Sequence, residues 1–179
     1  MLQRKWHPCL IQRNLSIPRI RPPSIWQFGR RYWRIVFSPA SRIALKRSPP
    51  NPEHGEEQFE IGLLLKKLLS KGHVITECPV STAEGVKGVD VTWISKERRG
   101  PQRGQVCFTQ APEICVEVIS PGNTRRELRE KKALFFAAGA DEVWFCNRDG
   151  QMEFFRKATP ETPASSVLCP AFPQRIQIG

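Results

Sequence analysis

The chain has 179 residues, and its 28 Lys and Arg against 17 Asp and Glu give a formal net charge of +11. This length fits one domain with a hydrophobic core, or one domain and an arm. No apolar stretch approaches the roughly 20 residues of a membrane-spanning helix, so we expect no membrane partner. The six cysteines show no Cys-x-x-Cys pair and no metal-type spacing with the three histidines, which argues against a zinc site. Cys115 and Cys146 lie in apolar segments, and buried thiols favour a reducing, cytoplasmic compartment.

The excess positive charge is concentrated near the N-terminus. Residues 1–52 contain 11 Lys and Arg and no acid, whereas residues 53–179 contain 17 basic and 17 acidic residues. We therefore predict a basic N-terminal extension over 1–48 and a domain over 49–179. Three interpretations of the extension stay open: a disordered arm that contacts phosphate, an Arg-rich targeting segment, or an extension that results from the choice of start codon.

The domain begins with a predicted helix over 56–70, which Gly72 is well placed to end. Its apolar residues cover more than half of its circumference, so the helix should pack against a sheet. Strands are predicted over 73–80, 89–95 and 113–120, and the basic, Gly- and Pro-containing segment 96–103 is predicted to be a loop.

A second helix is predicted after residue 120. Thr124, followed three positions later by Glu127, forms a capping-box pattern, and Gly139 is suited to end this helix. Two strands follow, over 142–146 and 152–157, joined by a tight turn, and a final short strand is predicted over 175–178. This order of elements predicts an α/β fold with a central sheet covered on both faces.

The strand over 113–120 carries an acid, Glu117, between Val116 and Val118. Because side chains alternate along a strand, Glu117 shares a face with Cys115, opposite the valines. A charged carboxylate that is buried alone is very costly, so Glu117 requires a proton, an ion-pair partner or a metal ion.

The preceding strand carries a second acid, Asp90. Alternation places Val89 and Val91 on one face of this strand and Asp90 with Thr92 on the other. Two acids on adjacent strands can hold a divalent cation, because magnesium is commonly bound by one or two carboxylates, phosphate and water.

A cation is expected from the second helix. Leu128 and Phe135 lie nearly in line along its inward face, and Lys131 and Lys132 flank that line. Either lysine could orient water or stabilise charge on a phosphate, and spacing alone does not choose between them. We expect Lys132 to be the solvated one.

The segments GVDVTWI and APEICVEVISPGNTRRELREKKALFFAAGADEVWF resemble the Uma family of restriction endonucleases, a branch of the PD-(D/E)XK nuclease superfamily. The resemblance covers about residues 49–179. It implies a restriction-endonuclease-like fold, with a mixed central β-sheet flanked by helices.

The resemblance also implies roles for individual residues. Asp90 and Glu117 match the metal-binding acids, and Lys131 matches the helix lysine, while Ile119 stands where other superfamily members carry a lysine. The implied cofactor is Mg²⁺, with Mn²⁺ as an alternative. The implied partner is nucleic acid, most simply DNA, and a homodimer is compatible with the family. The segment RRYWRIVFSPASRIAL lacks the acids of the family's opening motif.

A further acid from the first helix is common in such nucleases. Glu57 is one choice, and Glu53, Glu56 and Glu60 compete with it. His54 is more typical of a residue that fixes the start of a helix than of a catalytic one, and Ser120 more typical of a helix cap than of a nucleophile. The basic segment 96–103 is either a solvated loop or a phosphate contact beside the metal site.

These observations predict a magnesium-dependent endonuclease that hydrolyses phosphodiester bonds of DNA, with Asp90, Glu117 and Lys131 as its catalytic residues. Two alternatives stay open. One is a non-catalytic nuclease-fold protein that binds nucleic acid or a protein partner, and the other is a degraded or mis-started copy that folds poorly. Each acid also has a structural interpretation, with Glu117 in a buried ion pair with Lys131 and Asp90 at a strand end in water.

Overall fold

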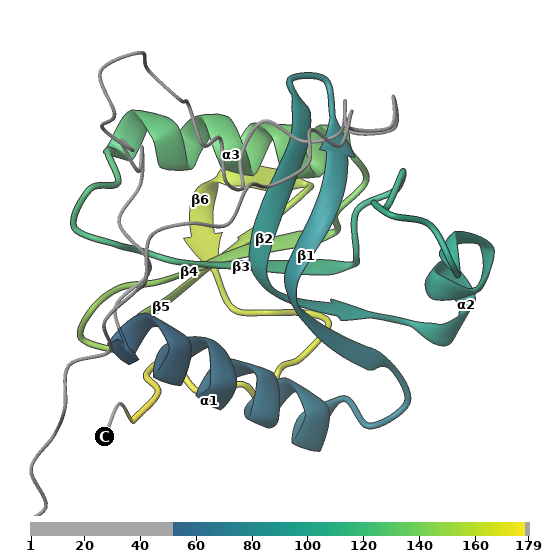
Figure 1. Ribbon diagram of the computed structural model, residues 1–179. Helices are drawn as coiled ribbons and strands as arrows, with labels where there is room; N and C mark the ends of the chain where they lie inside the picture. Colours follow the sequence, from purple (N-terminus) through teal and green to yellow (C-terminus); the bar gives the residue numbers. More distant parts are fainter. Residues whose placement is uncertain (1–51, 178–179) are drawn as a thin grey trace, which may run out of the picture.

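The computed structural model describes residues 52–177, in which a six-stranded sheet lies between two helices (Figure 1). Helix α1 (Pro52–Leu68) covers one face of the sheet and helix α3 (Arg125–Ala137) covers the other. The mixed sheet and flanking helices confirm the predicted α/β class. The basic extension predicted over 1–48 lies outside the described residues. None of the described helices is long and apolar enough to cross a membrane.

The strands follow one another across the sheet in chain order, β1 to β6. All neighbouring strands are antiparallel except β3 and β4, which are parallel because the chain returns through α3 between them. The strand bounds are β1 His73–Thr82, β2 Gly85–Ile94, β3 Ile114–Val118, β4 Glu142–Cys146, β5 Met152–Arg156 and β6 Thr159–Ala164.

Helix α3 begins as the sequence predicts. The Thr124 side chain accepts a hydrogen bond from the Glu127 backbone N–H, and the Thr124 N–H donates to the Glu127 carboxylate at 2.8 Å. This reciprocal capping box fixes where the helix starts after β3. Gly139, with φ +107°, follows the last residue of the helix cap and turns the chain into β4.

Two predictions of secondary structure were wrong, for segments 96–103 and 175–178, and strand β6 was not predicted. Segment 96–103 contains helix α2 (Lys96–Arg99) and a 3₁₀ turn, η1 (Gly100–Gln102), because the Ser95 side chain caps α2 by accepting from the Arg98 N–H. Segment 159–164 is an edge strand, where its two prolines are tolerated since one side needs no backbone donor. Among the described residues of 175–178, only Arg175 forms a β-bridge, an isolated one to Gln151, which precedes β5.

Each face of the sheet carries its own hydrophobic cluster, and each cluster contains two buried thiols. Ile61 and Leu65 of α1 pack on the first face, where Cys146 and Cys169 are buried. Phe135 of α3 packs on the second face, together with Cys78 and Cys115.

The β1–β2 hairpin bends across the sheet. Val91 packs with the α1-side cluster and Val89 with the α3-side cluster, so the prediction that they share a face was wrong. The bend coincides with Glu77, whose φ of +51° interrupts β1 beside this part of β2. In Figure 1 the hairpin accordingly runs from the level of α1 up to the level of α3. Regular alternation therefore fails at Asp90, the position between the two valines.

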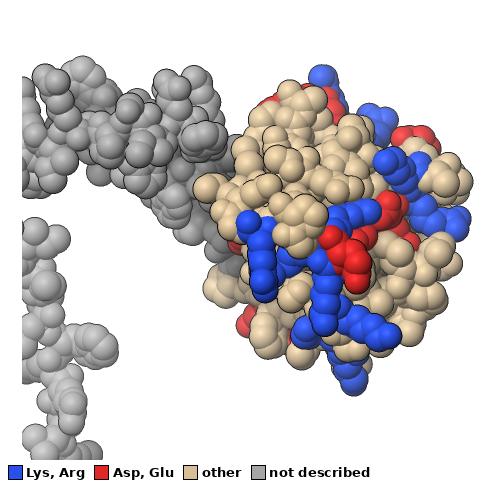
Figure 2. All heavy atoms as spheres, turned by 90° about the vertical axis from the view of Figure 1, so that its right-hand side faces the viewer, with Lys and Arg blue, Asp and Glu red and all other residues tan. Residues whose placement is uncertain are grey.

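Charge is unevenly placed on the domain. The face that carries α2 displays many Lys and Arg side chains, with a smaller acidic group among them (Figure 2). The first half of α1 instead carries Glu53, Glu56, Glu57 and Glu60. The two ends of α1 thus lie in surroundings of opposite charge.

Candidate metal and catalytic site

Asp90 lies where strands β2 and β3 separate. Regular pairing of these strands ends at Val91 and Val116, and the register places Asp90 opposite Glu117 at the next position. There the Asp90 Oδ2 atom accepts a hydrogen bond from the Val118 backbone N–H at 2.8 Å. The carboxylate therefore substitutes for a backbone partner and is held in a fixed orientation.

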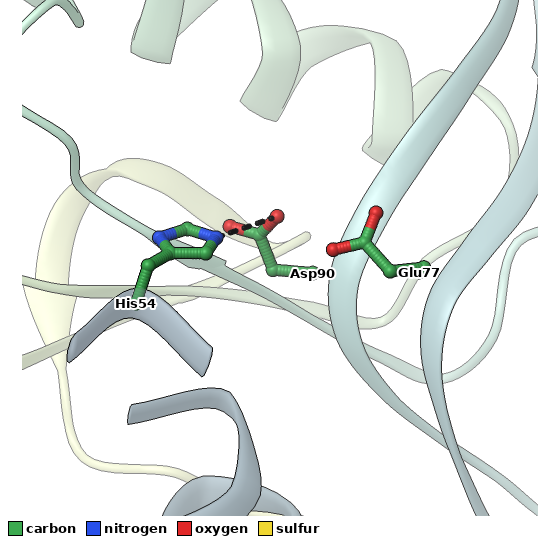
Figure 3. A group of neighbouring side chains, drawn as sticks. All are labelled: His54, Glu77 and Asp90. Atoms are coloured by element: carbon green, nitrogen blue, oxygen red, sulfur yellow. Dashed lines mark ion pairs between the residues drawn. The ribbon is translucent and has the colours of Figure 1, made fainter. Parts of the chain in front are cut away.

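Three side chains from three elements converge at this point (Figure 3). His54 comes from the first turn of α1, Glu77 from the bend of β1, and Asp90 from β2. One potential ligand atom from each lies within 4.8 Å of the others, and His54 Nε2 is 3.6 Å from Asp90 Oδ1. Imidazole and carboxylate groups in such proximity form a set of ligands suited to a divalent cation.

Gln58 connects two members of this group. Its side-chain amide nitrogen donates to Glu77 Oε1 at 2.7 Å and lies 3.1 Å from His54 Nε2. Gln58 lies one helical turn after His54 and is itself buried, so it orients both groups from within α1. The hydrogen bond to Asp90 raises the pKa of His54, against the opposite effect of burial.

Glu117 is buried beside this group, with 2% of its surface exposed. Lys131 Nζ donates to its Oε2 atom, while its Oε1 atom is buried without a hydrogen-bond partner among the described residues. Burial, followed by the nearby charge of Asp90, raises the pKa of Glu117 to about 7, although Lys131 acts in the opposite direction. The two carboxylates are thus close enough to repel each other.

The structure distinguishes the two lysines that spacing left equivalent. Lys131 reaches Glu117, whereas Lys132 is 4% exposed and donates to the Pro160 carbonyl oxygen. The Lys132 ammonium also lies 4.1 Å from the centre of the Phe155 ring. The prediction that Lys132 is solvated was wrong, because β6, which the sequence did not reveal, covers it.

The residues present fit a divalent cation. Oxygen atoms of Asp90 and Glu77 lie near one another, and the partnerless Oε1 atom of Glu117 is the kind of buried polar atom that a cation satisfies. The group of potential ligands, His54, Glu77 and Asp90, differs from the predicted pair of Asp90 and Glu117, since it contains Asp90 but not Glu117. Glu77 and Gln58 were missed, since neither strand alternation nor helix periodicity marks them, and His54 had been assigned mainly a structural role.

A hollow of about 230 Å³ opens next to the site. His54, Glu57, Ser120 and Arg148 contribute to its wall. Of the competing acids on α1, Glu57 alone is buried, and burial raises its pKa. Ser120 donates its backbone N–H to Asn123 rather than capping α3, whose cap is Thr124.

Comparisons with known proteins agree with this architecture. The sequence profile of the Uma2 family, described as "Putative restriction endonuclease", matches residues 43–178. A solved structure described as a putative nuclease belonging to DUF820, from Anabaena variabilis, superposes with a TM-score of 0.55 at 16% identity, over 65% of this chain and 67% of that one. At that identity the likeness establishes the shared fold. A search of curated proteins found no match.

Proposed function

This chain belongs to the Uma2 family, described as "Putative restriction endonuclease", and we propose that it is a divalent-metal-dependent endonuclease that hydrolyses phosphodiester bonds of DNA. One observation carries the proposal. The buried carboxylate of Glu117 has one oxygen on an ammonium group and the other without a hydrogen-bond partner within residues 52–177, and it lies beside the His54, Glu77 and Asp90 group.

Asp90 and Glu117 would hold the metal ion, with Glu77 and His54 as further ligands on the α1 side. When bound, magnesium polarises a scissile phosphate and lowers the pKa of an attacking water molecule. The hydrogen bond from Val118 to Asp90, and those of Gln58, keep the ligands in place before any substrate arrives. Such pre-organisation reduces the cost of arranging charge in the transition state.

Lys131 contributes a positive charge at the same place. Its ammonium group contacts Glu117 and is itself partly buried. In this position it can orient a water molecule or offset the negative charge that develops on the phosphate oxygens. Hydrolysis by this route needs no covalent enzyme intermediate.

The proposal is tested by plasmid cleavage. Purified protein should nick plasmid DNA with Mg²⁺ or Mn²⁺ and not with EDTA, and Asp90→Asn should slow cleavage by about a hundredfold or more. The matched control is Glu153→Gln, which changes an exposed acid on β5 and should cleave at the wild-type rate. Single-stranded DNA and RNA substrates assayed in parallel define the substrate.

A second function is favoured by one observation. Glu117 and Lys131 form an ion pair without a metal, as they would in a nuclease fold retained only for binding. Binding of DNA without cleavage under every metal condition, with the wild-type protein and Asp90→Asn behaving alike, would support this non-catalytic alternative over the nuclease.

A further inference from the structure

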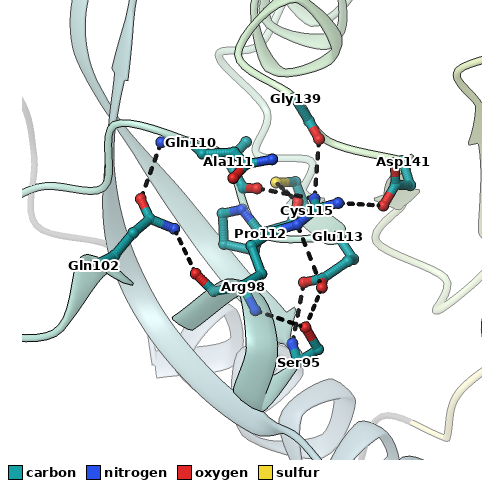
Figure 4. A network of polar contacts seen from close by, with 10 residues as sticks. All are labelled: Ser95, Arg98, Gln102, Gln110, Ala111, Pro112, Glu113, Cys115, Gly139 and Asp141. Carbon is teal, nitrogen blue, oxygen red and sulfur yellow. Dashed lines mark hydrogen bonds and ion pairs between the residues drawn. The ribbon is translucent and has the colours of Figure 1, made fainter. Parts of the chain in front are cut away.

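Helix α2 is anchored by a polar network to the end of the sheet (Figure 4). Arg98 donates to the carbonyl oxygens of Ala111 and Gly139 at 3.1 and 3.0 Å and to the Asp141 carboxylate at 2.8 Å. Gln102, in the following 3₁₀ turn, accepts from the Gln110 N–H at 2.9 Å. Segment 96–103 is therefore fixed, and Arg98 is turned inward and occupied. Arg98 is not a phosphate contact.

Of the other cations of this segment, Lys96 and Arg103 are exposed. Arg99 is half-buried, and its Nε atom is buried. Lys66, from the end of α1, adjoins them and donates to the Gly72 carbonyl oxygen at 3.2 Å. We refer to Lys66, Lys96, Arg99 and Arg103 as the α2 surface. Figure 2 looks onto the side of the domain that carries α2, where many Lys and Arg side chains gather.

Strand pairing brings the end of α1 next to α2, because Lys66 bonds to the Gly72 carbonyl oxygen and the next residue, His73, pairs with Ile94, two residues before Lys96. Apart from burial, the causes that lower the pKa of His73 are the charges of Arg99, Lys66, Lys96 and Arg103. Like charges that are held together in the folded state repel one another, and a polyanion relieves that repulsion. No ion pair to an acid is formed by any of the four within the part of the chain that the structure describes.

The α2 surface lies away from the metal site. His54 is in the first turn of α1 and Lys66 is in its last turn, and the 12 positions between them correspond to about 18 Å along the helix. Since residues 53–179 carry equal numbers of acidic and basic residues, this concentration of cations reflects their placement, not an excess in the domain.

We infer that the α2 surface binds the phosphodiester backbone of nucleic acid at a location separate from the catalytic site. Lys and Arg contacts to phosphate supply affinity that is independent of sequence and falls with salt. Because the network around Arg98 already fixes α2, binding orders little additional structure. The choice of nucleic acid over other polyanions rests on the proposed function.

Binding is measured by fluorescence anisotropy with labelled duplex DNA over a series of salt concentrations. The full chain is used with Asp90→Asn, in EDTA, so that cleavage plays no part. Adding Lys96→Gln, Arg99→Gln and Arg103→Gln should weaken binding on the order of tenfold. It should also reduce the slope of log affinity against log salt by about 3, since each lost phosphate contact removes nearly one unit.

The matched control removes three exposed charges elsewhere, by Arg126→Gln, Arg129→Gln and Lys157→Gln. Its slope should stay at the Asp90→Asn value. An equal loss in both triple variants, or no loss in the α2 triple variant, would overturn the inference.

Two further arms keep the outcome unambiguous. The double variant Lys96→Gln and Arg103→Gln changes only exposed side chains and should lose about 2 units of slope with an unchanged melting temperature. Vesicles rich in phosphatidylserine test an anionic lipid surface, and loss of vesicle binding with DNA binding intact would refute a nucleic-acid surface. If the protein does not cleave plasmid DNA but these slopes change as expected, the proposed nuclease function is refuted and nucleic-acid binding by the α2 surface is supported.

Discussion

Glu117 is the residue whose chemistry most depends on its surroundings. A carboxyl group in water is fully charged at neutral pH. Burial of Glu117, followed by the nearby charge of Asp90, raises its pKa to about 7, although Lys131 acts in the opposite direction. The folded protein therefore binds a proton that the unfolded chain has already released. A bound cation would replace that proton, because it favours the charged carboxylate.

The stability of the metal-free protein should depend on this titration. Since the folded pKa lies above the ordinary value of 4.5, the free energy of unfolding falls as pH rises from about 4.5 to about 7, by about 3 kcal/mol from this group. Urea unfolding in EDTA across this range measures the loss. Glu117→Gln cannot titrate, so the difference between wild type and variant should vary with pH by that amount. A constant difference would contradict the burial of an ionisable Glu117.

Local sequence signals predicted part of the site and missed the rest. Asp90, Glu117 and Lys131 were identifiable because a charge in an apolar pattern is unusual, and the structure brings all three into one region. Glu77 gave no such signal, because its place in the group depends on a positive φ in β1. Gln58 was missed as well, since a polar residue on a helix is unremarkable until its neighbours are known.

At the scale of elements, the bend of the β1–β2 hairpin carries Glu77 to His54 and Asp90. A residue other than glycine with φ of +51° is held in a conformation that costs about 1–2 kcal/mol. This cost falls on Glu77, the residue of β1 that would supply a ligand to the proposed metal ion. Backbone strain of this kind is common at functional sites.

Two substitutions at Glu77 separate the backbone from the carboxylate. Glu77→Ala and Glu77→Gly both remove the side chain, so both should weaken metal binding measured by calorimetry. Glycine adopts positive φ freely, although it gains more entropy on unfolding, so the Gly variant should be more stable than the Ala variant by about 0.5–1 kcal/mol. Urea unfolding decides this. An Ala variant as stable as the Gly variant would show that the bend imposes no strain.

Element order was predicted well where pattern and end signals agreed. The capping box at Thr124 and Glu127 predicted the start of α3 correctly, and strands β3 and β4 were predicted from their apolar runs, which the structure shows to be buried throughout. The edge strand β6 was missed because two prolines in TPETPA argue against a strand. Helix α2 was missed because Gly and Pro follow it closely, although a serine cap and the Arg98 network stabilise it.

At the scale of the whole molecule, charge and fold are arranged along α1. The acidic half of α1 adjoins the site, and its basic end adjoins the α2 surface. A negatively charged polymer is repelled by the site end unless cations are bound there, and it is attracted to the other end. Composition alone could not predict this, because residues 53–179 have no net charge.

The reactivity of the thiols buried on the two faces of the sheet reports whether the helix on each face separates from the sheet. Cys146 and Cys169 belong to the cluster on the α1 side, and Cys78 and Cys115 belong to the cluster on the α3 side. A small alkylating reagent should therefore reach the first pair only when α1 separates from the sheet, and the second pair only when α3 does. Burial also raises the pKa of Cys78 to about 11 and of Cys146 to about 12, which keeps the reactive thiolate scarce while the fold is closed. Pulsed alkylation followed by mass spectrometry should therefore reveal whether the two layers come apart together or in sequence. Modification of all four thiols at one common rate would mean a single cooperative transition, and a faster rate for one pair would identify the layer that peels away first.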